Sequence, residues 1–196
     1  MLVHQAPACR GVLRKISAAA IVSLASFAPG TLAHAASEPP LPLGSAAPAL
    51  ALPALRDEAR SLDALQGKVV IVHFFATWCE PCREEMAGLS RLVARSGDRP
   101  IALLAVDVGE PELRVRRFFD KQPMPFPILL DEDRAAMKAW GVAVLPTSFV
   151  LDGTHRLRLY AGGPVDWDAP SVLPLLERLN DPAAAPSEGT LPPLND

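Results

Sequence analysis

The sequence predicts an α/β fold in which helices cover both faces of a central mixed β-sheet. Two observations carry this prediction. Strand-like and helix-like segments alternate along residues 68–139, and a hairpin and a final helix follow them. The run from Lys68 to Phe75 is apolar on both faces, which is typical of a central strand in a covered sheet. Hydrophobic residues make up 49% of the 196 residues, enough for the core of one domain with tails.

Hydrophobic spacing defines the first half of the predicted domain. A buried strand is followed by a helix in which Met86, Leu89 and Leu92 lie on one stripe. Gly67 ends the helical turn that precedes this strand. The expected elements, in chain order, are a short strand at 49–55, a helical turn at 61–65, a strand at 68–75, a helix at 80–95 and a strand at 101–106.

Proline and glycine mark the elements of the second half. Pro111 stands in the first turn of a helix, and Gly141 stops a shorter one. Asp152-Gly153 forms the tight turn of a hairpin. The expected elements are a helix at 111–121, a strand at 126–130, a helix at 131–139, hairpin strands at 147–151 and 155–160, and a helix at 168–179.

Residues 1–35 are predicted to be an export signal. Arg10, Arg14 and Lys15 form a charged start, an uncharged and mostly apolar run follows, and Ala33-His34-Ala35 supplies the small-x-small pattern of a cleavage site. An uncleaved membrane anchor is the alternative, but the apolar run is short for a membrane span. In both cases the domain lies outside the cytoplasm, and we expect it in the periplasm.

Proline-rich segments flank the predicted domain. Residues 36–48 resemble a linker, the domain covers 49–180, and residues 181–196 are predicted to be a disordered tail. Removal of the signal leaves 16 basic and 22 acidic residues, a net charge of −6. This balance argues against a nucleic-acid partner.

The candidate catalytic motif of the chain is Trp78-Cys79-Glu80-Pro81-Cys82. It places two cysteines between a predicted strand and the N-terminus of a helix. The partial positive charge of a helix N-terminus favours thiolate, which is the attacking species in disulfide exchange. Cys9 is lost with the signal, so too few cysteines remain for a four-thiolate zinc site. We therefore expect a redox pair, with no metal and no cofactor.

The chain resembles the TlpA/ResA-like branch of the thioredoxin superfamily. The active-site motif matches at residues 78–83, and a second motif matches at residues 141–147, where the family has a cis proline facing the disulfide. Residues 107–130 resemble the extra helix and strand of this branch. The resemblance implies a thioredoxin fold with extra N-terminal strands and a central helix–strand insertion. It also implies a thiol:disulfide oxidoreductase outside the cytoplasm, often a reductant of apocytochrome c.

The two cysteines are expected to divide the exchange reaction. Cys79, nearest the helix end and the more exposed, is the predicted nucleophile, and Cys82, one turn further and buried, is the resolving thiol; the oxidised form is the Cys79–Cys82 disulfide. Glu80-Pro81 separates the sulfurs, and an acid there opposes thiolate formation, which moves the pair towards the reducing side. Trp78 is expected to pack over the active site.

Glu85 and His73 are the candidate proton-handling residues. Glu85 lies three residues after Cys82 on the same helix face, where the resembling branch also has a glutamate. A partly buried carboxylate there would have a raised pKa and exchange protons with Cys82; the alternative is a solvated surface glutamate. His73 interrupts the apolar strand and is a candidate proton relay, although a hydrogen-bonded core histidine is the commoner role.

Pro146 belongs to the second motif of the resemblance. The family implies a cis peptide bond before it and a Leu145 that offers backbone groups to an extended substrate. It also implies that Pro146 keeps a metal from the thiolates. The alternative is a trans proline that opens an edge strand.

The predicted function is the reduction of disulfides in exported proteins, with the CxxCH segment of apocytochrome c as a candidate substrate. The predicted partners are these proteins and a membrane dithiol that donates electrons, and we expect a monomer. Three alternatives stay open: a Cu(I)-binding protein that uses both thiolates and His73, a periplasmic dithiol oxidase, and a peroxidase, for which the chain lacks a Thr-x-x-Cys setting.

Overall fold

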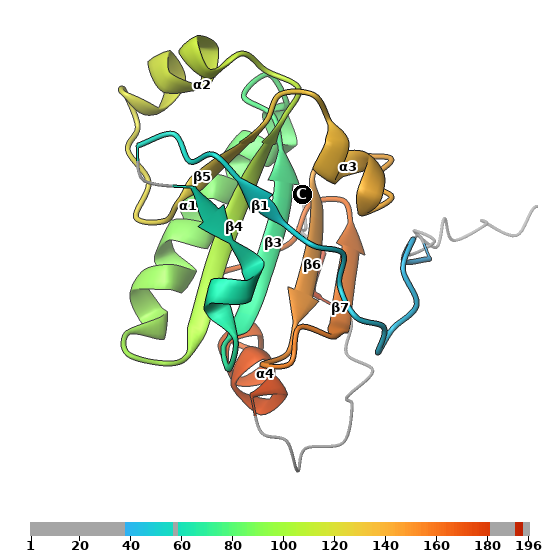
Figure 1. Ribbon diagram of the computed structural model, residues 1–196. Coiled ribbons are helices and arrows are strands. Elements are labelled where there is room, and N and C mark those ends of the chain that lie inside the picture. Colours follow the sequence, from blue (N-terminus) through green and yellow to red (C-terminus); the bar gives the residue numbers. More distant parts are fainter. Residues whose placement is uncertain (1–37, 57–58, 181–190, 194–196) are drawn as a thin grey trace, which may run out of the picture. The chain divides into compact units, whose positions relative to one another are not determined.

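A five-stranded mixed sheet, in the order β5-β4-β3-β6-β7, forms the centre of the fold (Figure 1). The protein is represented by a computed structural model that describes residues 38–56, 59–180 and 191–193. Strand β3 lies in the middle, parallel to β4 and antiparallel to β6. The strands are β3 (Val69–Phe75), β4 (Ile101–Val108), β5 (Ile128–Asp131), β6 (Thr147–Leu151) and β7 (Leu157–Gly162).

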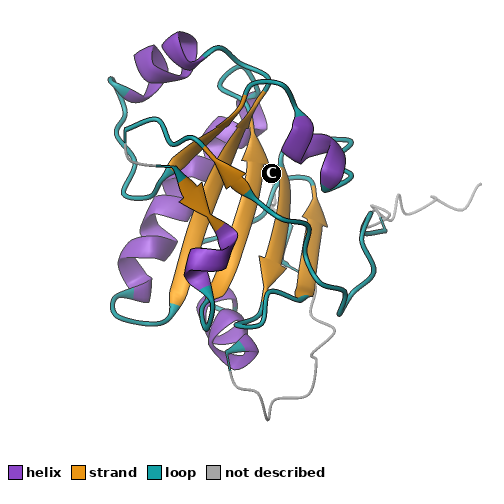
Figure 2. Cartoon of the chain, viewed as in Figure 1, coloured by secondary structure: helices purple, strands orange, loops and turns teal. Residues whose placement is uncertain are grey.

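Helices cover both faces of this sheet, as the sequence predicts (Figure 2). Alternate residues of β3 enter two separate cores: Ile71 and Phe75 pack with α1 and α4, while Phe74 packs with Trp140 and Phe149 on the other face. This explains why β3 is apolar at nearly every position. The helices are α1 (Glu80–Ser96), α2 (Glu112–Phe119), α3 (Ala135–Ala139) and α4 (Val172–Leu179).

The N-terminal part of the domain adds a small two-stranded sheet. Strands β1 (Ala51–Leu52) and β2 (Arg60–Ser61) are antiparallel, and a 3-10 turn, η1 (Leu62–Leu65), follows. The predicted strand at 49–55 is therefore longer than the strand observed. Residues 57–58, between β1 and β2, lie outside the described residues.

Part of the predicted linker is attached to the sheet. The Gly44 amide donates to the Leu157 carbonyl at 2.7 Å, and the Ala47 amide donates to the His155 carbonyl at 3.0 Å. These bonds attach the segment to the start of β7, the edge strand of the sheet. The ordered domain thus extends N-terminal to residue 49.

Helix α3 begins four residues later than expected. Asp131 is the last residue of β5, and its carboxylate accepts hydrogen bonds from the amides of Ala136 and Met137 at 3.0 and 2.8 Å. A carboxylate that satisfies free amides at a helix start fixes where the helix begins. Asp131, which the sequence analysis placed inside this helix, therefore lies before it and caps its N-terminus.

The two ends of the chain lie mostly outside the described residues, including the predicted signal (1–35) and residues 181–190. Three residues of the predicted disordered tail, 191–193, lie instead against the domain. Leu191 is buried, and the Asp166 amide donates to the Pro192 carbonyl at 3.0 Å. Within the described ranges, no helix is both long and apolar enough to cross a membrane.

Candidate active site

The Cys79–Cys82 disulfide lies at the N-terminus of α1, directly after the central strand β3. Its S–S distance is 1.98 Å. Cys79 is the N-cap residue, and the Cys82 amide donates to Cys79 Sγ at 3.3 Å. This amide is one of the free N–H groups at the helix start, so a thiolate on Cys79 would accept a charge-assisted hydrogen bond there.

The two sulfur-bearing residues differ in exposure, although less than expected. Cys79 retains 6% of its accessible surface and Cys82 retains none. Cys79 therefore carries the sulfur that a partner protein reaches first. This sulfur is only slightly exposed and does not project from the surface. The partner must bring its own sulfur into this shallow recess.

Glu85 is buried in the core, one turn below Cys82, so the solvated alternative is wrong. Only 2% of its surface is exposed. Its Oε1 atom accepts hydrogen bonds from the Val165 amide at 2.6 Å and from Trp167 Nε1 at 2.9 Å. Burial raises the pKa of Glu85 to about 8, although these two hydrogen bonds act in the opposite direction. At neutral pH the carboxyl group is therefore mostly protonated.

His73 is a fully buried histidine that faces Glu85. Its Nδ1 atom lies 2.8 Å from Ser148 Oγ, the residue paired with it across the β3–β6 ladder. Its Nε2 atom lies 3.9 Å from Glu85 Oε2, and neither of these two atoms has a hydrogen-bond partner among the described residues. Burial lowers the pKa of His73 to about 3, so both groups are neutral at pH 7 and the contact is no ion pair.

The hydrogen bonds of Glu85 and His73 indicate which of their atoms carry protons. Glu85 Oε1 accepts two hydrogen bonds, so the carboxyl proton belongs on Oε2, the atom facing His73. With Nδ1–H donating to Ser148, His73 Nε2 presents a lone pair to this proton. The distance exceeds a hydrogen bond by less than 1 Å, which is within the reach of a small side-chain movement.

A groove of about 470 Å³ adjoins Cys79 on the side of the second motif. The Leu145–Pro146 peptide bond is cis, as the resemblance implies. Trp78 does not pack into the core but is 62% exposed, and it forms one wall of this groove. The groove is lined by Trp78, Cys79, Val108, Arg134, Met137, Ala143, Val144 and Leu145.

Two buried carboxyl groups near the active-site loop, those of Asp107 and Glu110, were not identified from the sequence. Glu110 accepts hydrogen bonds from the amide and hydroxyl of Thr77, two residues before Cys79, and from Arg114 Nε at 2.8 Å. Asp107, at the end of β4, is 1% exposed and its two carboxyl oxygens have no hydrogen-bond partner among the described residues. Burial and the nearby charge of Glu110 raise the pKa of Asp107 to about 9.

Asp107→Asn is expected to stabilise the protein at alkaline pH. Because the folded-state pKa is raised, the stability that a protonated Asp107 provides is complete below about pH 4 and is lost as pH rises towards 9. Asparagine is neutral throughout, so the variant should gain on the order of 2 kcal/mol over the parent at pH 8 and little at pH 4. Urea unfolding at both pH values measures this, with the exposed Asp98→Asn as control. Equal gains at both pH values would contradict the assignment.

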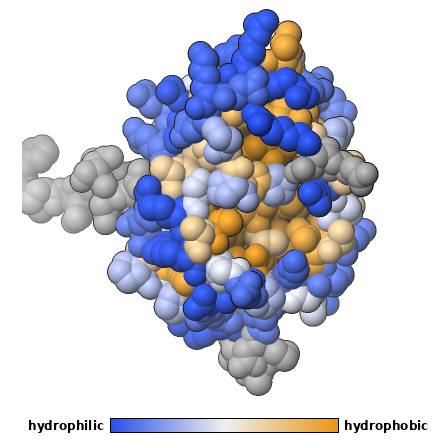
Figure 3. Space-filling model, turned by 90° about the vertical axis from the view of Figure 1, so that its left-hand side faces the viewer, coloured by the Kyte–Doolittle hydropathy of each residue, from blue (hydrophilic) through white to orange (hydrophobic). Residues whose placement is uncertain are grey.

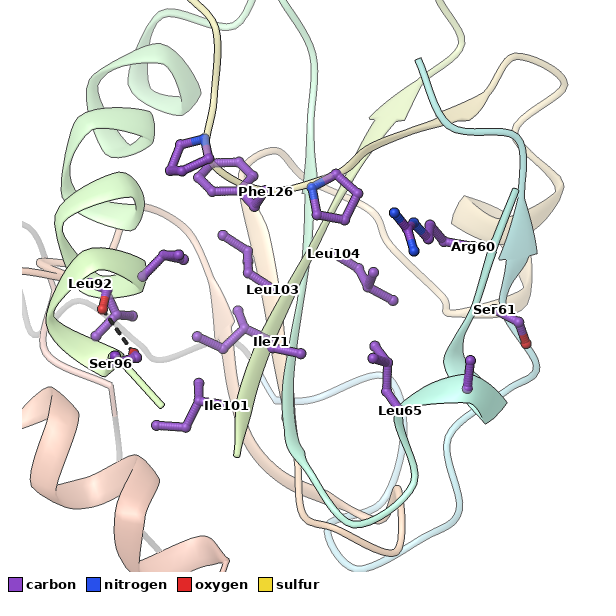
Figure 4. A pocket seen from close by; sticks show the side chains of 16 residues that line it. Arg60, Ser61, Leu65, Ile71, Leu92, Ser96, Ile101, Leu103, Leu104 and Phe126 are labelled. Carbon is purple, nitrogen blue, oxygen red and sulfur yellow. Dashed lines mark hydrogen bonds between the residues drawn. The ribbon is translucent and has the colours of Figure 1, made fainter. Parts of the chain in front are cut away.

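A second hollow, of about 400 Å³, lies between the C-terminal half of α1 and the β2–η1 segment (Figure 4). Apolar side chains such as Ile71, Leu92 and Phe126 line it. None of the described residues around it is a cysteine, a histidine or an acid. Its lining therefore supplies no thiol, imidazole or carboxyl group.

Comparison with known sequences agrees with this geometry. Residues 43–160 match the AhpC/TSA family. The thiol-disulfide oxidoreductase ResA of Geobacillus thermodenitrificans is 35% identical over 116 residues, which span 59% of this chain and 67% of that relative. ResA of Bacillus subtilis is 34% identical over 109 residues, which span 56% of this chain and 61% of that protein.

Solved structures share the fold. A putative thiol:disulfide interchange protein DsbE from Chlorobium tepidum has a TM-score of 0.67 at 25% identity, and the match covers 72% of this chain and 99% of that one. A putative thioredoxin from Neisseria meningitidis has a TM-score of 0.62 at 26% identity, covering 71% and 93%. The predicted thioredoxin-like fold is confirmed.

Proposed function

The chain belongs to the AhpC/TSA family and is a thiol-disulfide oxidoreductase, and we propose that it works in the periplasm as a reductant of disulfides in exported proteins. One observation carries the reaction: a buried carboxyl group, Glu85, lies one turn below the buried cysteine of a disulfide at a helix N-terminus. This arrangement supplies a thiolate for attack and a nearby base for resolution.

The first step needs only Cys79. Its thiolate, favoured by the helix N-terminus, attacks one sulfur of the substrate disulfide. A bond forms between Cys79 and that sulfur, the substrate S–S bond breaks, and the other substrate sulfur leaves as a thiolate that takes a proton from solvent. The product is a mixed disulfide between enzyme and substrate.

The second step needs Cys82 as a thiolate. Burial raises the pKa of a thiol in apolar surroundings, so Cys82 requires a base. Glu85 has a pKa of about 8, close to the working pH, so its ionised fraction can accept this proton. Cys82 then attacks Cys79, the enzyme disulfide forms and the reduced substrate leaves, which transfers two electrons in total.

His73 acts in this scheme as a partner of Glu85. A pKa of about 3 makes the imidazole a poor acceptor of a full proton at neutral pH. Its Nε2 atom instead lies 3.9 Å from Glu85 Oε2, from where a small side-chain movement would let it accept a hydrogen bond from the protonated acid. We therefore assign the transferable proton to Glu85 and a positioning role to His73.

The direction of electron flow rests on the charge around the pair. Glu80 adds a negative charge between the two cysteines, which disfavours the thiolate and therefore the reduced state. A less stable reduced state makes the dithiol a stronger reductant. An exported reductant needs a source of electrons, and a membrane dithiol is the proposed donor.

The substrate proposal rests on the predicted export signal and on relatives that are named ResA. Exported proteins with accessible disulfides are the proposed substrates, among them the CxxCH segment of apocytochrome c, and the enzyme is proposed to act as a monomer. Trp78 and the groove beside Leu145 and Pro146 would hold an extended segment next to Cys79.

The reduction potential of the Cys79–Cys82 couple tests the proposal. Equilibration with glutathione or dithiothreitol buffers should give a value below about −220 mV, and the reduced enzyme should then open an oxidised CxxCH peptide in stoichiometric amounts. A value near about −120 mV would overturn the reductant assignment and favour a dithiol oxidase. The copper alternative needs His73 beside the thiolates, whereas both of its ring nitrogens face Ser148 and Glu85.

A further inference from the structure

A hollow of about 600 Å³ lies near the active-site loop and shares no lining residue with the groove beside Leu145. It lies between the first turn of α1 and helix α2, the helix of the predicted insertion. Thr77, two residues before Cys79, and Arg83, directly after Cys82, connect it to the redox pair. Its other charged lining residues are Arg114, Arg117 and Lys121.

Most of the positive charge in this hollow is uncompensated. Arg114 pairs with the buried Glu110, so its charge is balanced. Arg83 lies over the ring of Phe118 at 5.8 Å from the centroid. Arg83, Arg117 and Lys121 form no ion pair with any described residue, and all three are exposed.

The acids of this region are engaged elsewhere or lie outside the hollow. On α2, Glu112 pairs with Arg116, and Asp120, next to Lys121, pairs with Arg56. Glu80 and Glu84 of α1 are exposed but do not line the hollow. Figure 3 shows the hydrophilic surface over the α2 end of the molecule, above an apolar area. Three cations without an ion-pair partner among the described residues thus line a hollow close to the active-site loop, in a chain whose formal net charge is −3.

We propose that this cationic hollow binds an acidic segment of the protein whose disulfide Cys79 attacks. The proposal rests on the proposed reductase function and specifies its substrate class. A partner that reaches Cys79 from the groove beside Leu145 and also fills the hollow must extend from one to the other across the active-site loop. Such a partner is a folded or extended protein chain that bears Asp or Glu near its disulfide.

The chemistry of the hollow fits carboxylates in particular. Arginine guanidinium groups bind carboxylates through two parallel hydrogen bonds, and stacking of Arg83 on Phe118 restrains one guanidinium in advance. Exposed charges at the rim of an interface mainly raise the rate of association, and salt weakens their effect. The hollow should therefore change kcat/KM for a substrate and leave the rate of the exchange step unchanged.

The test compares disulfide peptides that differ only in the residues flanking the disulfide: Asp-Asp, Ser-Ser or Lys-Lys. The parent should reduce the acidic peptide with the highest kcat/KM at low ionic strength. In the Arg117→Glu/Lys121→Glu variant, kcat/KM for the acidic peptide should fall about ten-fold and kcat should stay constant. The Ser-Ser peptide should change little, and 0.5 M salt should remove most of the difference.

A matched control carries the same charge change at the far end of the domain. Lys68→Glu/Arg178→Glu alters the start of β3 and the end of α4, both remote from the cysteines (Figure 1). An equal loss in this control, or equal kcat/KM for acidic and basic peptides in the parent, would overturn the proposal. Failure of the parent to reduce any of the peptides would instead overturn the reductase function itself. Thermal unfolding of both variants checks that they fold.

Discussion

Cys79→Ser is expected to abolish disulfide reduction, and Cys82→Ser is expected to accumulate a mixed disulfide with the substrate. Cys79 provides the attacking thiolate at the helix N-terminus, and serine at pH 7 provides no comparable nucleophile. Cys82 is fully buried, so in its absence the mixed disulfide has no internal thiol to resolve it. Steady-state turnover should fall by at least about 10³-fold in both variants.

The two variants differ in what they leave behind, and this difference assigns the roles. Mass spectrometry under non-reducing conditions should find the substrate attached to Cys79 in Cys82→Ser and no adduct in Cys79→Ser. Cys9→Ser, in the predicted signal, is the matched control and should retain full activity. An adduct on Cys82, or full turnover by either active-site variant, would show that the order of attack is different.

The fold was predictable because its signals are local. Strand β3 is apolar on both faces, and the cysteine pair that follows it marks the start of α1. Residues whose positions depend on capping or edge pairing were less predictable. Asp131 ends β5 and caps α3, and the backbone of residues 44–47 is bonded to the start of β7, although the chain there resembles a linker.

The candidate site was predictable only where its parts lie close in sequence. The i, i+3 spacing of Cys82 and Glu85 could be read directly from the sequence, but the sequence left open whether Glu85 is buried or solvated. The contact of His73 with Ser148 depends on the register between β3 and β6, which no local pattern fixes. Val165 and Trp167, which hold Glu85, come from the loop after β7 and reach the site only through tertiary packing.

The carboxyl pair beside Thr77 shows the same limit. Asp107 ends a strand and Glu110 precedes a helix, so each has an ordinary explanation in the sequence. Glu110 reaches Thr77 of the active-site loop because parallel strands β3 and β4 end at the same edge of the sheet. Trp78, expected to pack over the active site, is exposed and lines the groove beside Cys79.

Glu85→Gln is expected to slow resolution of the mixed disulfide about 10²-fold at pH 8 and to remove its pH dependence near that value. In the parent, the resolution rate should rise as the carboxyl group ionises around its pKa of about 8. Glutamine can still accept the hydrogen bonds from Val165 and Trp167 through its side-chain oxygen, so the packing is retained. Quenched-flow measurement of substrate release between pH 6 and 10 gives the profile.

Two further variants separate proton transfer from structure. Glu84→Gln, the exposed neighbour on α1, should leave both the rate and the profile unchanged. His73→Asn removes the ring nitrogen 3.9 Å from Glu85 Oε2; if a small movement lets this nitrogen accept the carboxyl proton, its loss should move the inflection to lower pH. An unmoved inflection would exclude the His73 contact, whereas a Glu85→Gln profile identical to that of the parent would exclude Glu85 as the base for Cys82.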